Sequence, residues 1–338
     1  MSNGQAIRTE GLGKTYRSRK QGSTGLRASL KAFVKPEYQE VQAVAGVDLR
    51  LGSGEIRALI GPNGAGKSTL IKMLCGILHP SYGSVECLGM EPWKHREEYV
   101  RRIGAVFGQK TQLMWDLPAS DSFLINKQVY RISDAVYKRS MDYFEERFGL
   151  SQFKERAVRN LSLGERMRCE LVAALLHEPS LVFLDEPTIG MDILAKDMVR
   201  QFVRDVNRER GVTFILTTHD LGDVENLCEK ISVINQGKVV FDGEQSELKQ
   251  SLGGKKRLEL SFNRPLTEAE LSRATEEGAR FTPTDLGHVL AASWELSGSG
   301  AASSAMAASL MVNYPTADIG VRDPDIEEVI RQLYQGVK

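Results

Sequence analysis

One run of residues has the composition and spacing of a phosphate-binding loop: Gly61-Pro62-Asn63-Gly64-Ala65-Gly66-Lys67-Ser68-Thr69. Its glycines let backbone N–H groups turn inward around an anion. We expect the ammonium group of Lys67 to reach the terminal phosphates of a nucleotide, and the hydroxyl of Ser68 to bind Mg²⁺. The run therefore predicts a nucleotide-binding loop and not an ordinary glycine turn.

The segments on either side of this loop have the patterns that such a loop requires. Residues 56–60 are mostly apolar and predict a buried strand. After the loop, apolar residues recur at helical spacing, at Leu70, Met73, Leu74 and Ile77. A strand, a glycine loop and a helix in this order point the positive end of the helix at the bound phosphates.

Two further predicted strands end in side chains that can do chemistry. The apolar strand 181–184 is followed by Asp185 and Glu186, and such carboxylates are costly at a buried position unless a ligand needs them. We expect Asp185 to bind Mg²⁺ and Glu186 to act as a general base on water. His219 follows the strand 213–218. A lone histidine at a strand end is often structural, but this one would face the sheet edge where ligands bind in open α/β folds.

Two other positions allow both a structural and a functional interpretation. Ser162 and Glu165 fit the capping box that begins a helix, and a capped helix N-terminus is also an anion site. Tyr16 is either a surface residue or an aromatic ring that stacks on a nucleotide base.

The composition limits the class of protein. The chain has 338 residues, enough for one large domain and a smaller one. Lys+Arg and Asp+Glu both number 44, so net charge does not favour nucleic acid as a partner. The four cysteines include no C-x-x-C pair, which fits a reducing cytosol better than a disulfide framework or a zinc site. We find no signal segment and no run near the ~20 apolar residues of a membrane span, so we expect a cytosolic protein that reaches membranes through partners.

The order of predicted elements indicates an α/β fold with two domains, at 1–250 and 255–338, separated near Gly253-Gly254-Lys255-Lys256. The first begins with an antiparallel β part and contains a helical subdomain at about 119–180. The second has the strand-helix-strand-strand-helix-strand order of a ferredoxin-like domain, followed by a last helix.

Two stretches suggest partner surfaces. A helix is predicted at about 24–35, with an apolar face beside a basic stripe; the apolar residues are Leu26, Leu30, Phe33 and Val34, and the basic ones Arg27, Lys31 and Lys35. This helix either lies on its own domain or meets an anionic membrane face or a membrane partner. The second stretch is a loop with several large apolar side chains, which often mark a partner site: Leu113, Met114, Trp115 and Leu117.

Together the motifs resemble the nucleotide-binding subunit of an ABC transporter. They are, in chain order, Gly61–Thr69, Gln109, Leu161-Ser162-Leu163-Gly164-Glu165, Leu181–Glu186, Asp192 and His219. The resemblance covers roughly residues 5–245, and each motif follows the expected strand or helix. The stretches after Gln109, after Glu165 and around Asp185 look like those of bacterial ATPases paired with type-2 exporter permeases. The ferredoxin-like tail is similar to the C-terminal extension of such ATPases.

The resemblance implies a role for each matching residue. Tyr16 corresponds to the aromatic that stacks on adenine, and Gln109 to the glutamine that touches Mg²⁺ and responds to the membrane partner. Ser162 and Gly164 correspond to the signature that contacts the γ-phosphate from the opposite subunit. Asp185 and Glu186 correspond to the Mg²⁺-binding aspartate and the catalytic glutamate. Gly190-Met191-Asp192 corresponds to the D-loop, and His219 to the switch histidine.

The resemblance also implies partners and a location. The expected activity is ATP hydrolysis that drives export through a separate permease, with two ATP molecules between this chain and a second copy or a paralogous ATPase. The expected location is the cytoplasmic face of the cell membrane, held there by the permease. Two alternatives are a polysaccharide-exporter ATPase of the same superfamily and a soluble ABC ATPase acting on ribosomes or DNA. A third is a regulatory module without turnover, which the presence of Glu186 and His219 opposes.

The signature departs from the usual L-S-G-G-Q. Leu163 stands for the first glycine and Glu165 for the glutamine, whereas Ser162 and Gly164 are kept. A carboxylate near a triphosphate is repulsive unless the capping box occupies it. Because Lys67, Glu186 and His219 are all present, we interpret the departure as tuning and expect the chain to remain active.

Overall fold

A computed structural model of the chain describes residues 4–19, 38–108, 110–251, 256–283, 289–296, 300–322, 330–331 and 333–334. The predicted helix at 24–35, Gln109 and the predicted boundary at 253–255 lie outside these residues. The chain divides into two units, Met1–Glu244 and Gln245–Lys338.

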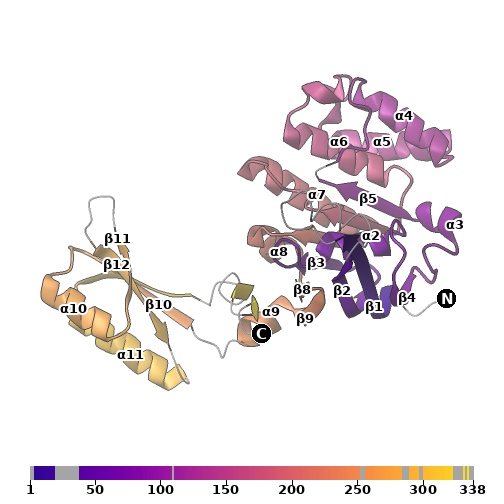
Figure 1. Ribbon diagram of the computed structural model, residues 1–338. Helices are drawn as coiled ribbons and strands as arrows, with labels where there is room; N and C mark the ends of the chain where they lie inside the picture. The colour runs from indigo at the N-terminus through magenta and orange to yellow at the C-terminus, as the bar shows by residue number, and fades with distance from the viewer. Residues whose placement is uncertain are drawn as a thin grey trace, which may run out of the picture. The chain divides into compact units, whose positions relative to one another are not determined.

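The core of the first unit is a six-stranded sheet with the order β5-β6-β7-β3-β8-β9 (Figure 1). Its strands are β3 (Ile56–Ile60), β5 (Ile103–Phe107), β6 (Leu181–Asp185), β7 (Thr213–Thr218), β8 (Lys230–Asn235) and β9 (Lys238–Glu244). The first five in this order are parallel, and β9 pairs antiparallel with β8. Because the parallel strands share a direction, their carboxyl ends meet at one edge, which is where such sheets bind ligands.

A second, three-stranded antiparallel sheet packs in the same unit. Its order is β2-β1-β4, with β1 (Gln5–Arg19), β2 (Tyr38–Gly52) and β4 (Tyr82–Cys87). Side chains of both sheets and of the helix after β3 form one buried apolar cluster, which includes Leu49, Leu59, Leu70, Val85 and Phe183. This shared core fixes the helix after β3 against both sheets.

The helices of the first unit complete the α/β architecture. They are α2 (Lys67–Leu74), α3 (Arg96–Val100), α4 (Ala119–Val129), α5 (Asp134–Phe148), α6 (Leu163–Leu175), α7 (Ile193–Arg210) and α8 (Leu221–Leu227), with short 3₁₀ turns η1 (Leu150–Gln152) and η2 (Val158–Asn160). Figure 1 shows α4, α5 and α6 grouped at the end of the unit away from β1, β2 and β4. This group is the helical subdomain that the sequence predicts at about 119–180.

The second unit is a small α+β domain. It contains α9 (Gln245–Ser251), β10 (Lys256–Phe262), α10 (Glu268–Glu276), β11 (Arg280–Pro283), β12 (Val289–Leu296), α11 (Gly300–Asn313) and β13 (Thr316–Arg322). The sheet order β11-β12-β10-β13 with antiparallel pairing is that of a ferredoxin-like fold, as expected from the order of elements. Trp294, Leu258, Leu260 and Tyr314 lie in its apolar core. Of the predicted last helix, only 330–331 and 333–334 are described.

Candidate nucleotide-binding site

The glycine loop joins β3 to α2 in the geometry that phosphate binding requires. Gly66 caps α2 with φ at 106°, a left-handed conformation that favours glycine, and no side chain caps this helix end. A Cβ on Gly66 would also lie 2.2 Å from the carbonyl oxygen of Ala43 on β2. The first N–H groups of α2 are thus free of side-chain caps and available to an anion.

Lys67 lies inside this loop. Its side chain is buried, and Nζ donates hydrogen bonds to the carbonyl oxygens of Gly61 at 2.6 Å and of Pro62 at 3.1 Å. Burial lowers the pKa of Lys67 below its ordinary value of 10.5, while the charges of Glu186 and Asp185 oppose that shift. The ammonium group of Lys67 therefore lies close enough to Asp185 and Glu186 for their charges to act on it.

Ser68 and Asp185 make direct contact at the carboxyl edge of the sheet. Ser68 Oγ donates to Asp185 Oδ1 at 3.2 Å, and Thr217 Oγ1 on β7 donates to the same oxygen at 2.5 Å. Among the described residues no cluster of three or more His, Cys, Asp or Glu side chains can hold a metal. One carboxylate and one hydroxyl fit Mg²⁺, which proteins bind through few side chains together with substrate phosphates and water.

Glu186 and His219 face each other across the ends of β6 and β7. His219 Nδ1 lies 3.5 Å from Glu186 Oε1, and the histidine side chain is 57% exposed whereas the glutamate side chain is 18% exposed. Glu186 has φ at 54°, a left-handed conformation that is unusual for a residue with a side chain. Its N–H donates to Thr217 O at 3.1 Å and to Thr217 Oγ1 at 3.0 Å, which holds the backbone there. Such strain is typical of functional sites.

The segment that leads to Gln109 leaves β5 directly beside these carboxylates. Gly108 N donates to Asp185 O at 2.8 Å, and a Cβ on Gly108 would lie 2.3 Å from Glu186 O. Only glycine fits this approach of two backbones. Gln109 itself is not among the described residues, so its contact with Mg²⁺ stays a prediction.

The predicted capping box at the signature is confirmed. Glu165 N donates to Ser162 Oγ at 3.2 Å, and Ser162 N donates to Glu165 Oε2 at 2.9 Å. Arg156 forms an ion pair with Glu165. Burial raises the pKa of Glu165, but the hydrogen bonds from Ser162 and Arg156 outweigh it, so the net pKa lies below the ordinary value. The carboxylate is therefore engaged within its own helix end.

The signature residues lie next to the segment 190–195. A Cβ on Gly164 would lie 3.0 Å from Ala195 Cβ, and Leu163 Cδ2 would lie 3.2 Å from a Cβ on Gly190. Asp192 caps α7, because its Oδ1 accepts a hydrogen bond from Ala195 N at 2.8 Å. Leu163, which replaces a glycine of the usual signature, thus packs against this segment of the same chain.

Tyr16 lies within β1. It is partly exposed, pairs with Val41 of β2, and has Lys14 Nζ 5.6 Å from its ring centre. Val41 lies two residues before Ala43, whose carbonyl oxygen touches Gly66. This position is compatible with stacking on a base, and the exposed ring is equally compatible with a surface residue.

The apolar loop after Gln109 requires one correction. Met114, Trp115 and Leu117 are 42% to 47% exposed, but Leu113 is 5% exposed and does not belong to the surface. Leu113 faces inward because its neighbours Thr111 and Gln112 are held by Glu170 of α6. Adjacent loop residues therefore face opposite ways, which the apolar composition alone does not reveal.

Two buried charged groups near the site were missed by sequence reasoning. Glu170 lies in α6 and accepts hydrogen bonds from Thr111 Oγ1 and from Gln112 N at 3.2 Å. Arg200 and Asp223 form a buried ion pair between α7 and α8. For Glu170 a signal was available, because it shares one helix face with Leu163, Met167 and Ala174, which are apolar. Arg200 and Asp223 had none.

Comparison with known proteins agrees with this geometry. The family model described as "ABC transporter" matches residues 44–189. The chain is 31% identical to the ABC transporter ATP-binding protein NatA of Bacillus subtilis (strain 168), over 62% of this chain and 85% of the relative. It is 34% identical to the daunorubicin/doxorubicin resistance ATP-binding protein DrrA of Streptomyces peucetius, over 71% of this chain and 73% of that relative.

Solved structures show the same fold. An ATP-binding subunit of an ABC transporter superposes with a TM-score of 0.60 at 24% identity, covering 73% of this chain and 93% of that chain. A dimeric structure of a bacterial ABC transporter cassette gives a TM-score of 0.57 at 23% identity, covering 70% and 98%. The chain belongs to the ATP-binding proteins of ABC transporters, and its activity is ATP hydrolysis that energises export through a separate membrane permease.

Proposed function

We propose that the sheet edge formed by β3, β6 and β7 is the ATP-hydrolysis site of this chain, with each motif residue in the role that the family resemblance implies. The observation that carries this proposal is the pair of contacts Ser68–Asp185 and Glu186–His219 at that edge. The P-loop residues Gly61–Thr69 bind the phosphates through backbone N–H groups. Phosphoryl transfer needs positioning and charge stabilisation more than covalent chemistry, and this edge supplies both.

In the proposed reaction Glu186 orients a water molecule and accepts its proton. The water oxygen forms a bond to the γ-phosphorus, and the bond from that phosphorus to the bridging oxygen of ADP breaks. Lys67 and His219 stabilise the negative charge on the phosphoryl oxygens during this step. The 3.5 Å separation of His219 Nδ1 and Glu186 Oε1 supports a role for both groups at the same reacting phosphate.

Ser68 and Asp185 would hold Mg²⁺ in this site, together with Gln109. The ion supplies neutralisation of charge on the β- and γ-phosphate oxygens when it is bound. Asp185 has two donors on one oxygen, Ser68 and Thr217, which fix the orientation of the carboxylate. Among the described residues no side chain donates to its second oxygen, Oδ2, which could therefore bind Mg²⁺.

We further propose that two nucleotides are bound between this chain and a second ATPase subunit, either a copy of itself or a paralogue. Ser162 and Gly164 would contact the γ-phosphate held by the other subunit. Ser162 is exposed at the N-terminus of α6, where its hydroxyl and the helix N–H groups can meet an anion. The dimeric relative described above supports this arrangement.

The permease is proposed to dock on the exposed part of the loop after Gln109. Met114, Trp115 and Leu117 expose apolar surface there, and Leu124 and Ile125 of the following helix α4 are exposed as well. Apolar surface of this extent usually marks a partner site. None of the described helices is long and apolar enough to cross a membrane. Docking would place the chain at the cytoplasmic face of the membrane.

Phosphate release by the purified chain tests this assignment. Lys67→Ala is expected to lower turnover by about 100-fold or more, because it removes the charge nearest the terminal phosphates. Lys72→Ala is the matched control, since Lys72 lies in the last turn of the same helix. Turnover that is equal in Lys67→Ala and Lys72→Ala would contradict the site.

A further inference from the structure

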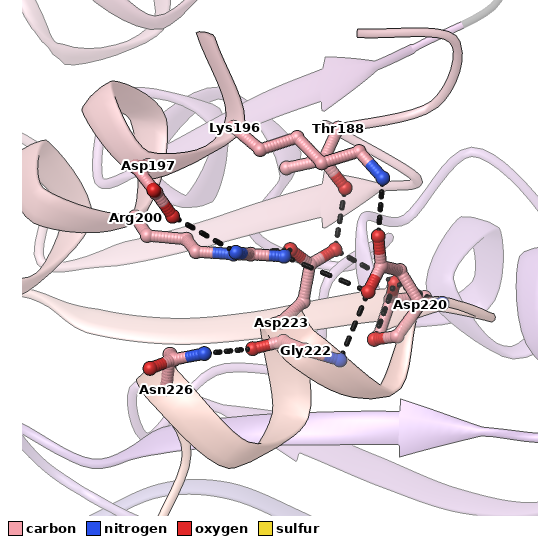
Figure 2. Close-up of polar contacts among 9 residues, drawn as sticks. Thr188, Lys196, Asp197, Arg200, Asp220, Gly222, Asp223 and Asn226 are labelled. Atoms are coloured by element: carbon pink, nitrogen blue, oxygen red, sulfur yellow. Dashed lines mark hydrogen bonds and ion pairs between the residues drawn. The ribbon is translucent and has the colours of Figure 1, made fainter. Parts of the chain in front are cut away.

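Behind His219 lies a cluster of buried charged and hydroxyl side chains that the proposed chemistry does not use. Its centre is Asp223 on α8, whose side chain is fully buried, paired with Arg200 on α7, whose side chain is 9% exposed. Figure 2 shows the cluster between these two helices and the segment that carries Thr188. Three stretches of chain that are distant in sequence thus meet at one carboxylate.

The side-chain contacts of Asp223 join α7 to two segments of the proposed site. Arg200 Nε donates to Asp223 Oδ1 at 2.7 Å, and Thr218 Oγ1 donates to Asp223 Oδ2 at 2.8 Å. Thr188 Oγ1 donates to the same oxygen, Oδ2. Thr218 precedes His219, and Thr188 comes two residues after Glu186. The carboxylate therefore ties the histidine segment to the glutamate segment.

A second carboxylate holds the other side of His219. Asp220 forms ion pairs with Lys196 and, at 3.5 Å, with Arg200, both on α7. Asp220 Oδ1 also accepts from Gly222 N at 2.9 Å, and Asp220 N donates to Thr218 Oγ1 at 2.9 Å. Both chain neighbours of His219 are therefore fixed, whereas its own ring is largely exposed.

The burial of this ion pair is by itself weak evidence that it serves stability. Buried ion pairs contribute little net stability compared with apolar side chains of similar size, because both charges lose their hydration. What such a pair does fix is geometry, since Arg200 and Asp223 satisfy each other only in one arrangement of α7 and α8.

We propose that Arg200 and Asp223 are positioning residues that hold His219 opposite Glu186. This inference rests on the proposed role of His219 in hydrolysis. In this role the pair acts on the reaction only through the backbone on each side of the histidine. A displacement of about 1 Å at a reacting group costs up to about 100-fold in rate. Loss of the pair should therefore affect turnover more than ATP binding.

A double-mutant cycle on phosphate release tests the inference. Asp223→Asn is expected to lower kcat about 10-fold or more while the Kd for ATP changes less than about 2-fold. In a His219→Ala background the same substitution should change kcat less than about 2-fold, because residues that act through one group are not additive. Thr188→Val removes only one donor to Asp223 and should lower kcat less, again only when His219 is present. This variant keeps the inference testable if Asp223→Asn does not fold.

Arg57→Met is the matched control. Arg57 is an equally buried cation, but it pairs with Glu55 and Asp242 near the start of β3. The Arg57→Met variant should have lower thermal stability than the wild type and an unchanged kcat.

A full additional loss of kcat from Asp223→Asn in the His219→Ala background would overturn the inference and leave the role of His219 intact. An equal loss of kcat in Arg57→Met would also overturn it, because any buried ion pair would then have that effect. Unchanged kcat in His219→Ala alone would overturn both the role of the histidine and the inference.

Discussion

Strand β3 has charged groups near both of its ends, and the two ends are built differently. At its start Arg57 is enclosed: it contacts Glu55 Oε1 at 2.6 Å, Ser232 Oγ at 3.1 Å and the carboxylate of Asp242. At its other end Lys67 and Ser68 share an open edge with Glu186 and His219. There the Ser68–Asp185 contact is 3.2 Å, the Glu186–His219 contact is 3.5 Å, and the histidine is largely exposed. The same sheet thus holds a closed ion cluster and an open one.

The difference separates charge that serves the fold from charge that serves a ligand. In the closed cluster every charge has a partner within the chain, so no charged group is left there to bind a phosphate. At the open edge the uncapped N-terminus of α2 can bind the phosphates, and the carboxylate of Asp185 can bind the accompanying Mg²⁺. The strained backbone at Glu186 is typical of a functional site. Substitutions at the two ends should therefore affect different measurements.

The largest effect on folding is expected at the closed end. Arg57→Met leaves the carboxylates of Glu55 and Asp242 without their cation, and breaking a partly buried pair in this way costs about 3 kcal/mol of stability. Chemical denaturation measures this loss, and ATP turnover at low temperature should stay within about 2-fold of wild type. If Arg57→Met lowers turnover strongly and leaves stability unchanged, the two ends of β3 do not differ in the way described.

A smaller effect, on assembly, is expected at the apolar loop beside the open edge. Trp115→Ala should lower co-purification with the permease several-fold while ATP affinity is unchanged, because it removes exposed apolar surface. Ile77→Ala, an exposed apolar residue just after α2, is the control. If Trp115→Ala instead lowers the thermal stability of the isolated chain, Trp115 packs within its own subdomain, where Arg166 already lies 5.7 Å from its ring.

The smallest effect concerns pH and the buried carboxyl group of Glu170. Burial raises its pKa above the ordinary value of 4.5, although hydrogen bonds from Thr111 and Gln112 oppose the shift. Because the folded state holds the proton more tightly than the unfolded state, wild-type stability should fall as pH rises above about 4.5. Glu170→Gln cannot ionise, and its amide oxygen can still accept both hydrogen bonds.

The free energies of unfolding of the two proteins should therefore agree near pH 4 and diverge as the pH rises toward neutral, with the variant more stable. Denaturant unfolding across this range measures the difference. Curves that stay parallel at every pH would show that Glu170 titrates normally.

Much of the fold was predictable because its signals are local. The strand 56–60, the glycine loop and the helix after it are encoded within about twenty adjacent residues, and the structure has β3 at Ile56–Ile60 and α2 beginning at Lys67. The ferredoxin-like order of the tail followed from alternating strand and helix patterns. The full length of β1 did not, since its last part, from Lys14 to Arg19, is polar and is held by pairing with β2.

The motif residues of the candidate site were predictable from the sequence. The buried residues that hold them in place were not. Asp185, Glu186 and His219 each follow an apolar strand, so their common edge follows from parallel strand order. Arg200 and Asp223 lie on different helices, and no spacing rule relates a residue of α7 to one of α8. The outward or inward direction of Leu113 likewise depends on Glu170, which is distant in sequence.

The most direct test of the central claim, that the open edge hydrolyses ATP, is turnover and association of Glu186→Gln. The variant keeps the shape of the side chain and removes its capacity to accept a proton. It is expected to bind ATP as wild type does, to release phosphate about 100-fold or more slowly, and to elute as a stable dimer in size-exclusion chromatography with ATP. Glu97→Gln, at an exposed position on α3, should behave as wild type. Wild-type turnover by Glu186→Gln would contradict the account.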